Sequence, residues 1–242
     1  MTSIDSEVVL LACAGSAPAP RPLPLHGSRR PRTLPDIPRI DLSGPPDRSN
    51  IDPILRDRSP RRVIVAGGDA DLAAVVLRLL RTERLDVEIA YLPAGPTPAT
   101  RAWGLPHGRA AAELAVAGTA GPVPLVRDDN GGVLVGRGEI SPIVGECWCD
   151  QHLVLRGRGP RLVVVPTPDG IAVRAGRSRR PPDGTLRPLP PKIPSGRGSA
   201  VGRAVQIGGE PMTVVHDGVT HPRLVPRWTW FRHTEDLLLV RA

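Results

Sequence analysis

The stretch from residue 61 to residue 80, RRVIVAGGDADLAAVVLRLL, most constrains how this chain can fold. Residues 63–66 are a short apolar run, which predicts a buried strand. Two glycines, Gly67 and Gly68, follow it. The next apolar residues recur at the spacing of one helix face, at Leu72, Val75, Val76, Leu79 and Leu80. A strand, a glycine turn and an amphipathic helix predict part of a βαβ unit.

The flanking residues extend this pattern. Residues 7–14 and 87–92 predict two further buried strands, and residues 108–118 predict a short helix that stops at a glycine. We therefore predict a Rossmann-like parallel α/β domain over residues 1–121. Inside it, residues 17–60 are rich in proline and arginine without apolar periodicity, so we expect them to be mostly irregular.

The pattern changes after residue 122. Short apolar runs separated by turns predict strands at residues 123–126, 133–136, 153–156, 162–165, 171–174, 204–207, 212–215 and 237–240. We predict an antiparallel β-sandwich domain over residues 122–242, so the fold class is α/β followed by β. A basic, proline-rich insertion at residues 177–199 interrupts this domain and is open to two interpretations, a solvated loop or an anion-binding surface.

The charge of the chain leaves several partners open. The net charge is +8, and Lys192 is the only lysine among 32 basic residues. Such a bias fits either a GC-rich genome or an anionic partner such as a lipid substrate or a membrane surface. Aromatic residues make up only 2% of the chain, which argues against binding to single-stranded nucleic acid. A homodimer also stays open.

Cysteine content and hydropathy bear on location and metal binding. Three cysteines do not form a disulfide framework, and no apolar run approaches the roughly 20 residues that span a bilayer. We expect a cytoplasmic protein, with peripheral membrane attachment left open. Cys147, Cys149 and His152 form a cluster that is open to two interpretations, zinc binding or two cysteines buried on one strand face. Trp228 and Trp230 share a face, in the core or against lipid.

The turn after residue 66 has a candidate chemistry of its own. Two glycines let backbone N–H groups face a phosphate at the start of a helix. Asp69 would then bind either Mg²⁺ carried by the phosphate or a ribose hydroxyl. The structural alternative is a tight turn in which Asp69 or Asp71 caps the helix.

These segments together resemble the catalytic family of diacylglycerol kinases and related lipid kinases. That family has a strand ending in GGDGT, a helix, a strand ending in a PAGT loop, an ALGLP-like segment and a later Asp-Gly-Glu turn. This chain has VIVAGGDADL, a helix, IAYLPAGPTPATRAWGLP and HDGV in the same order. The resemblance implies transfer of the γ-phosphate of ATP, through Mg²⁺, to a lipid hydroxyl. By resemblance, nucleotide binding falls to Gly67, Gly68, Asp69, Gly95 and Thr97, metal binding to Asp69, and catalysis to Asp217.

The chain also departs from the family pattern. Asp71 replaces the threonine of GGDGT and adds a negative charge beside the expected phosphate. Pro96 lacks the N–H that would face a phosphate. Val219 replaces the glutamate that the resemblance implies as the base, for which His216, Asp217 or His221 would have to substitute. The sequence thus leaves open a lipid kinase, a degenerate kinase-like scaffold that binds lipid, nucleotide or a partner, and a basic binder of membranes or nucleic acid.

Overall fold

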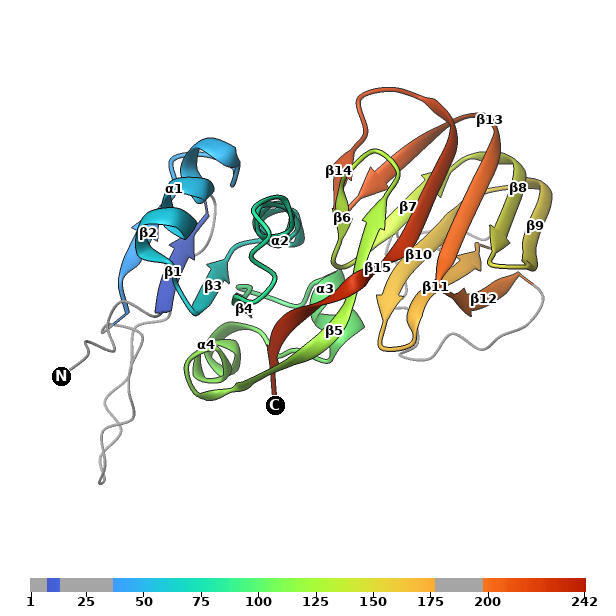
Figure 1. The fold of residues 1–242 in the computed structure, drawn as a ribbon. Helices are drawn as coiled ribbons and strands as arrows, with labels where there is room; N and C mark the ends of the chain where they lie inside the picture. The colour runs from blue at the N-terminus through green and yellow to red at the C-terminus, as the bar shows by residue number, and fades with distance from the viewer. Residues whose placement is uncertain (1–7, 14–36, 177–197) are drawn as a thin grey trace. The chain divides into compact units, whose positions relative to one another are not determined.

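The computed structural model describes residues 8–13, 37–176 and 198–242. The chain divides into two compact units. Unit 1 contains residues up to Thr100, Gly104–Val123 and Asp236–Ala242, and unit 2 contains Arg101–Trp103 and Pro124–Glu235. The predicted fold class is confirmed, because a parallel α/β region precedes a largely antiparallel β region (Figure 1).

Unit 1 has a parallel sheet in the order β2-β1-β3-β4. Its strands are β1 (Val8–Ala12), β2 (Arg39–Asp41), β3 (Arg62–Ala66) and β4 (Glu88–Leu92). Its helices are α1 (Arg48–Arg58), α2 (Asp69–Arg81), the start of α3 (Pro98–Trp103), and α4 (Gly108–Ala117). α1 and α2 lie on one side of these strands and α4 on the other (Figure 1). The strands at 7–14, 63–66 and 87–92 and the helix at 108–118 are thereby confirmed.

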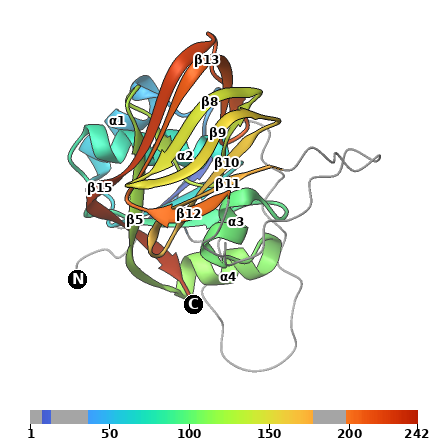
Figure 2. The ribbon, with the colours of Figure 1, turned by 90° about the vertical axis from the view of Figure 1, so that its right-hand side faces the viewer.

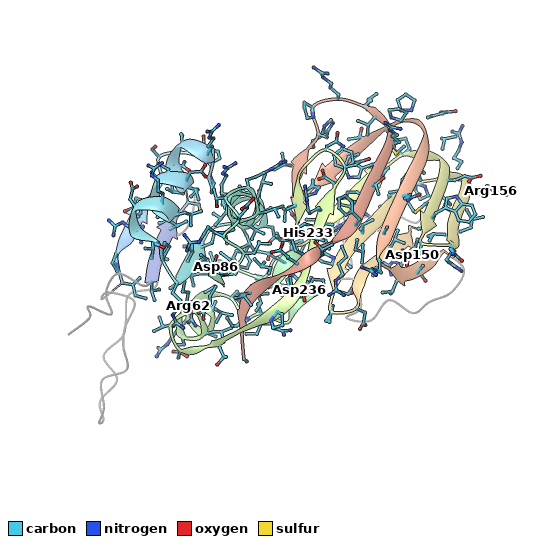
Figure 3. All side chains as sticks on the ribbon, in the orientation of Figure 1. Arg62, Asp86, Asp150, Arg156, His233 and Asp236 are labelled. Atoms are coloured by element: carbon cyan, nitrogen blue, oxygen red, sulfur yellow. The ribbon has the colours of Figure 1, made fainter. Side chains whose placement is uncertain are left out.

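α4 packs on the sheet through small residues. Ala111, Ala112 and Ala115 share a buried cluster with Leu10, Ile64 and Leu92 from three strands. Arg62, at the start of β3, holds the carboxyl end of α4 (Figure 3). Its guanidinium donates to the carbonyls of Ala115 and Gly118 at 2.9 Å each. A cation at a helix carboxyl end satisfies carbonyls that lack intrahelical partners.

The expectation of irregular structure over residues 17–60 is wrong at Arg39–Asp41 and Arg48–Arg58, where the structure has β2 and α1; residues 42–47 between them have no helix or strand. α1 forms because Asp47 caps it, accepting from Ser49 N at 2.8 Å and Asn50 N at 3.1 Å. Ile51 and Leu55, four residues apart, are its buried residues. Residues 17–36 of the predicted irregular stretch lie outside the described residues.

Unit 2 is built from short antiparallel strands. They are β6 (Val133–Leu134), β7 (Gly138–Ser141), β8 (Ile143–Cys149), β9 (His152–Gly159), β10 (Leu162–Thr167), β11 (Gly170–Ala175), β12 (Ser199–Gly202), β13 (Ala204–His216) and β14 (Val219–Thr220). Two long strands, β5 (Thr119–Asp128) and β15 (Val225–Arg241), contribute residues to both units. Figure 2 shows β8 beside β9, as their pairing requires. Residues 177–197 of the predicted basic insertion lie outside the described residues.

Two features of the β strands differ from the sequence prediction. The runs at 204–207 and 212–215 are one strand, β13, whose pairing with β15 shifts register between Gly208 and Met212. The run at 237–240 was placed in the antiparallel half, but it is the end of β15, where Leu239 pairs in parallel with Ile89 of β4. A buried apolar run carries no signal for strand direction, so the sequence could not separate these cases.

The tryptophans and two of the cysteines form the core of unit 2. Trp228, Trp230, Cys147 and Cys149 belong to one buried cluster. Burial raises the pKa of Cys147 to about 12 and that of Cys149 to about 11, so both thiols are protonated at neutral pH. Within the described ranges, no group of three or more His, Cys, Asp or Glu residues is placed to hold a metal ion. Of the two interpretations of Cys147 and Cys149, the structure therefore favours burial on one strand face over zinc binding.

Candidate functional site

The carboxyl ends of β1 and β3 are where an open α/β sheet binds ligands. From β1 the chain continues to β2 on one side, and from β3 it continues through α2 to β4 on the other side. Adjacent strands whose connections leave in opposite directions form a crevice at their carboxyl ends. Cys13 lies at the end of β1, where its N–H donates to Ala66 O at 2.9 Å. The turn at Gly67 and Gly68 lies directly beside it.

The turn itself is closed by a carboxylate. Gly68 is the N-cap residue of α2, and its N–H donates to Asp71 Oδ2 at 2.9 Å. The Asp71 side chain lies so close to Gly67 that a Cβ there would stand 2.5 Å from Oδ2. Gly67 is thus required by the position of Asp71. A carboxylate of the chain itself occupies the N-cap N–H that a phosphate would use.

Cys13 lies near this negative charge. Burial, and to a lesser extent the charge of Asp71, raises the pKa of the Cys13 thiol to about 12. A thiol with this pKa is protonated and unreactive at neutral pH. Cys13 is therefore uncharged beside Asp71.

Of the two capping residues that the sequence offers for α2, Asp71 bonds the N-cap N–H and Asp69 does not. The buried carboxylate of Asp69 accepts from Tyr91 Oη at 2.8 Å and from Ala99 N at 3.0 Å. It thereby ties the start of α2 to β4 and to the first turn of α3. Burial, followed by the charge of Asp69, raises the pKa of Tyr91, so the hydroxyl remains a donor. Both oxygens of the predicted metal ligand are engaged within unit 1.

The loop after β4 holds the two remaining nucleotide candidates. Thr97 is the N-cap residue of α3, and its Oγ1 accepts from Thr100 N at 3.1 Å. Gly95 has open space around it, with nothing within 4 Å of the position of a Cβ. Gly67, Gly68, Asp69, Gly95 and Thr97 therefore all lie at the carboxyl ends of β3 and β4. Their role in binding a nucleotide stays a prediction.

Two features of this site were missed in the sequence. Tyr91 is the only tyrosine of the chain and lies one residue before the end of β4. The second is α3, because no helix is predicted from the sequence at residues 98–103. Its signal was Thr97 followed by Pro98, an N-cap residue and a proline at the first helical position.

Asp217 lies in unit 2, in the turn after β13. Its carboxylate accepts three consecutive backbone N–H groups, from Val135 at 2.9 Å, Gly136 at 2.8 Å and Arg137 at 2.8 Å. Burial raises the pKa of Asp217 from 3.8 to about 6. Its proposed catalytic role stays a prediction, and the observed contacts give it a structural role.

His216 lies between two carboxylates of unit 2. Its Nε2 is 3.1 Å from Asp128 Oδ2, and its Nδ1 is 3.7 Å from Asp217 Oδ2. Burial opposes ionisation of Asp128, but His216 and the N–H groups of Gly132 and Asn130 hold its pKa below the usual value. The His216 ring is thus flanked by two carboxylates of its own unit, and its buried Nε2 has no hydrogen bond of good geometry among the described residues.

The whole chain resembles solved structures of diacylglycerol kinases. One from Bacillus anthracis str. Sterne gives a TM-score of 0.66 at 13% identity, covering 98% of this chain and 97% of that chain. A putative diacylglycerol kinase from the same organism gives 0.65 at 11% identity, covering 100% and 99%. The chain has the fold of the diacylglycerol kinases. No family model and no curated protein matches this chain by sequence.

An NAD kinase from Archaeoglobus fulgidus, solved in complex with ATP, shares part of this diacylglycerol kinase fold. Its TM-score is 0.53 at 14% identity, covering 85% of this chain and 84% of that chain. The fold is thus one in which another protein binds ATP. In this chain, however, Asp71 holds Gly68 N, both oxygens of Asp69 are engaged, and Pro96 has no N–H to offer. These residues, as arranged, do not fit ATP with Mg²⁺.

The sequence contains no apolar run long enough to span a bilayer and leaves peripheral membrane attachment open. Among the residues that the structure describes, no helix has both the length and the apolar character needed to cross a membrane.

Proposed function

We propose that this chain is a non-catalytic protein with the diacylglycerol kinase fold, a binding scaffold that does not transfer phosphate from ATP. The observation that carries this proposal is the carboxylate of Asp71 on Gly68 N, 2.9 Å away, at the start of α2. A phosphate brought to this turn would meet a fixed negative charge at the position where it needs a donor. Like charges at contact distance repel each other, which opposes the binding of a phosphate at this turn.

The arrangement of Asp69 supports the same conclusion. A carboxylate that binds Mg²⁺ must direct an oxygen lone pair at the ion, and Mg²⁺ demands near-octahedral oxygen ligands. Asp69 instead accepts from Tyr91 and Ala99, which fixes its orientation toward β4 and α3. The polar groups of this turn are therefore used in hydrogen bonds within the chain. These bonds join the start of α2 to the end of β4 and to the first turn of α3.

The second candidate function is ATP-dependent phosphorylation of a lipid hydroxyl. What favours it is the structural similarity over nearly the full chain to diacylglycerol kinases, together with the ATP complex of the related NAD kinase. Under this alternative, Asp71 would have to leave Gly68 when nucleotide binds.

Calorimetric titration of ATP with Mg²⁺ separates the two. We expect no binding heat with the unaltered chain at millimolar ATP, and no transfer of labelled phosphate to diacylglycerol. The variant Asp71→Thr restores the hydroxyl of the family pattern and frees Gly68 N, so we expect it to bind ATP more tightly than the unaltered chain. Asp86→Thr, at an exposed position before β4, is the matched control for loss of one negative charge.

The opposite result would establish the second candidate. ATP binding by the unaltered chain that the Asp69→Ala variant loses, with label in the lipid, means that the turn opens for nucleotide and that the scaffold proposal is wrong.

A further inference from the structure

The connection between β13 and β15 exposes large apolar side chains, which are otherwise almost all shielded from solvent in the described residues. Among the large hydrophobic residues that the structure describes, three are exposed: Val201 at 37%, Val219 at 57% and Leu224 at 62%. Two of these belong to the same connection, residues 217–224, and Pro222 between them is exposed as well. Scattered single exposed residues are normal, but two prominent aliphatic side chains on one short connection are a feature to explain.

This connection is held in a defined conformation. Asp217 at its start binds three backbone N–H groups, as described above. His221 N donates to Val214 O at 2.8 Å, and the His221 ring packs edge-on against Trp228, with centroids 5.2 Å apart. Val219 pairs with His216 in the β13–β14 ladder. The exposed side chains are therefore presented by an ordered turn, and docking would lose little conformational entropy.

The exposed charges within residues 217–227 are positive, and the exposed acidic neighbour on the paired strand is Glu210, between Gly208 and Met212 of β13. Arg223 and Arg227 are exposed, and from residue 217 to residue 227 the one acidic side chain is that of Asp217, which is buried. The whole chain carries +8. Aliphatic side chains next to arginines favour the interface of an anionic bilayer, where the aliphatic groups leave water and the guanidinium groups meet lipid phosphates. A neutral protein partner would give no reason for the arginines.

We propose that residues 218–227 dock this protein onto an anionic lipid surface. Val219 and Leu224 enter the boundary between headgroups and acyl chains, and Arg223 and Arg227 contact the lipid phosphates. This inference names the partner of the proposed scaffold and rests on that proposed function, but it requires no nucleotide.

Vesicle sedimentation with the full chain, without nucleotide, tests the docking. We expect binding to vesicles of equal parts phosphatidylcholine and phosphatidylglycerol, weakened by salt, and much weaker binding to phosphatidylcholine alone. The double variant Val219→Ser/Leu224→Ser should bind about tenfold more weakly, because two partly exposed aliphatic groups are lost. Arg223→Gln/Arg227→Gln should lower binding to anionic vesicles by about tenfold or more and flatten the salt dependence.

The control variant is Val201→Ser, which removes the third exposed aliphatic side chain from β12. It should bind vesicles like the unaltered chain, and circular dichroism should show all variants folded. Equal vesicle binding by the unaltered chain and both double variants would overturn the proposal. So would a loss of self-association in Val219→Ser/Leu224→Ser without vesicle binding by any form, because the turn would then be a contact between copies. ATP titration separately decides the scaffold function, so the two failures are distinguishable.

Discussion

Asp69 in unit 1 and Asp217 in unit 2 are both buried carboxylates that bind donors of their own unit, but the donors differ in kind. Asp69 accepts one side-chain hydroxyl, from Tyr91, and one backbone N–H. Asp217 accepts three consecutive backbone N–H groups. A hydroxyl can rotate toward another acceptor, whereas three backbone donors cannot be redirected without refolding their loop. Asp69 is therefore held by fewer backbone donors than Asp217, and its removal should cost less stability.

The strongest test of this difference is Asp217→Ala. It leaves three buried N–H groups without acceptors, so we expect the free energy of unfolding to fall by about 3 kcal/mol or more. Urea unfolding measures this loss. Asp169→Ala, in the exposed turn between β10 and β11, is the control and should change stability by less than about 0.5 kcal/mol. A small effect of Asp217→Ala would mean that the loop at residues 135–137 finds other acceptors.

The stability cost of Asp217→Ala should depend on pH. Because burial raises the pKa of Asp217 to about 6, the folded chain binds its proton at higher pH than the unfolded chain. The stability gained by protonation is fully present below the unfolded pKa and is lost as pH rises through about 6. The cost of Asp217→Ala should therefore grow from neutral pH to acid pH, by on the order of 2 kcal/mol. A cost that stays constant across this range would exclude the raised pKa.

A smaller loss of stability is expected at Asp69, in unit 1. Asp69→Ala removes the acceptor of Tyr91 and Ala99 and should cost about 2 kcal/mol, and Tyr91→Phe about 1 kcal/mol. Because the two side chains contact each other, the double variant should cost less than the sum, with a coupling of about 1 kcal/mol. Urea unfolding of the four forms gives this coupling. Strict additivity would show that the contact contributes nothing, and Asp69 would then be free for a ligand.

The part of the fold that could be predicted from sequence follows from burial. Strands β1, β3 and β4 are compact apolar runs, and α2 shows an apolar face, so periodicity alone locates them. α1 was missed because it buries only Ile51 and Leu55 and carries Pro53 within it. Its visible signal was local, in Asp47 and Asn50, which form a capping box.

The candidate site shows a different limit. The motif order placed Gly67, Asp69 and Thr97 at neighbouring strand ends, and the structure has them there. The sequence could not show which donors each carboxylate would take, because those donors come from residues 22 to 82 positions away, such as Tyr91 and Val135. The identity of a residue does not show whether its side chain binds a ligand or donors of the protein itself.

The smallest predicted effect compares the two glycine turns of unit 1. Gly95→Ala meets open space, so its stability should stay within about 0.5 kcal/mol of the unaltered chain. Gly67→Ala places a Cβ 2.5 Å from Asp71 Oδ2, so Asp71 must move and its bond to Gly68 N weakens, at about 1 kcal/mol. In an Asp71→Ala background this cost should vanish, because the obstructing carboxylate is gone. If Gly67→Ala keeps its cost there, the glycine is required by the backbone of the turn, and Asp71 does not close it.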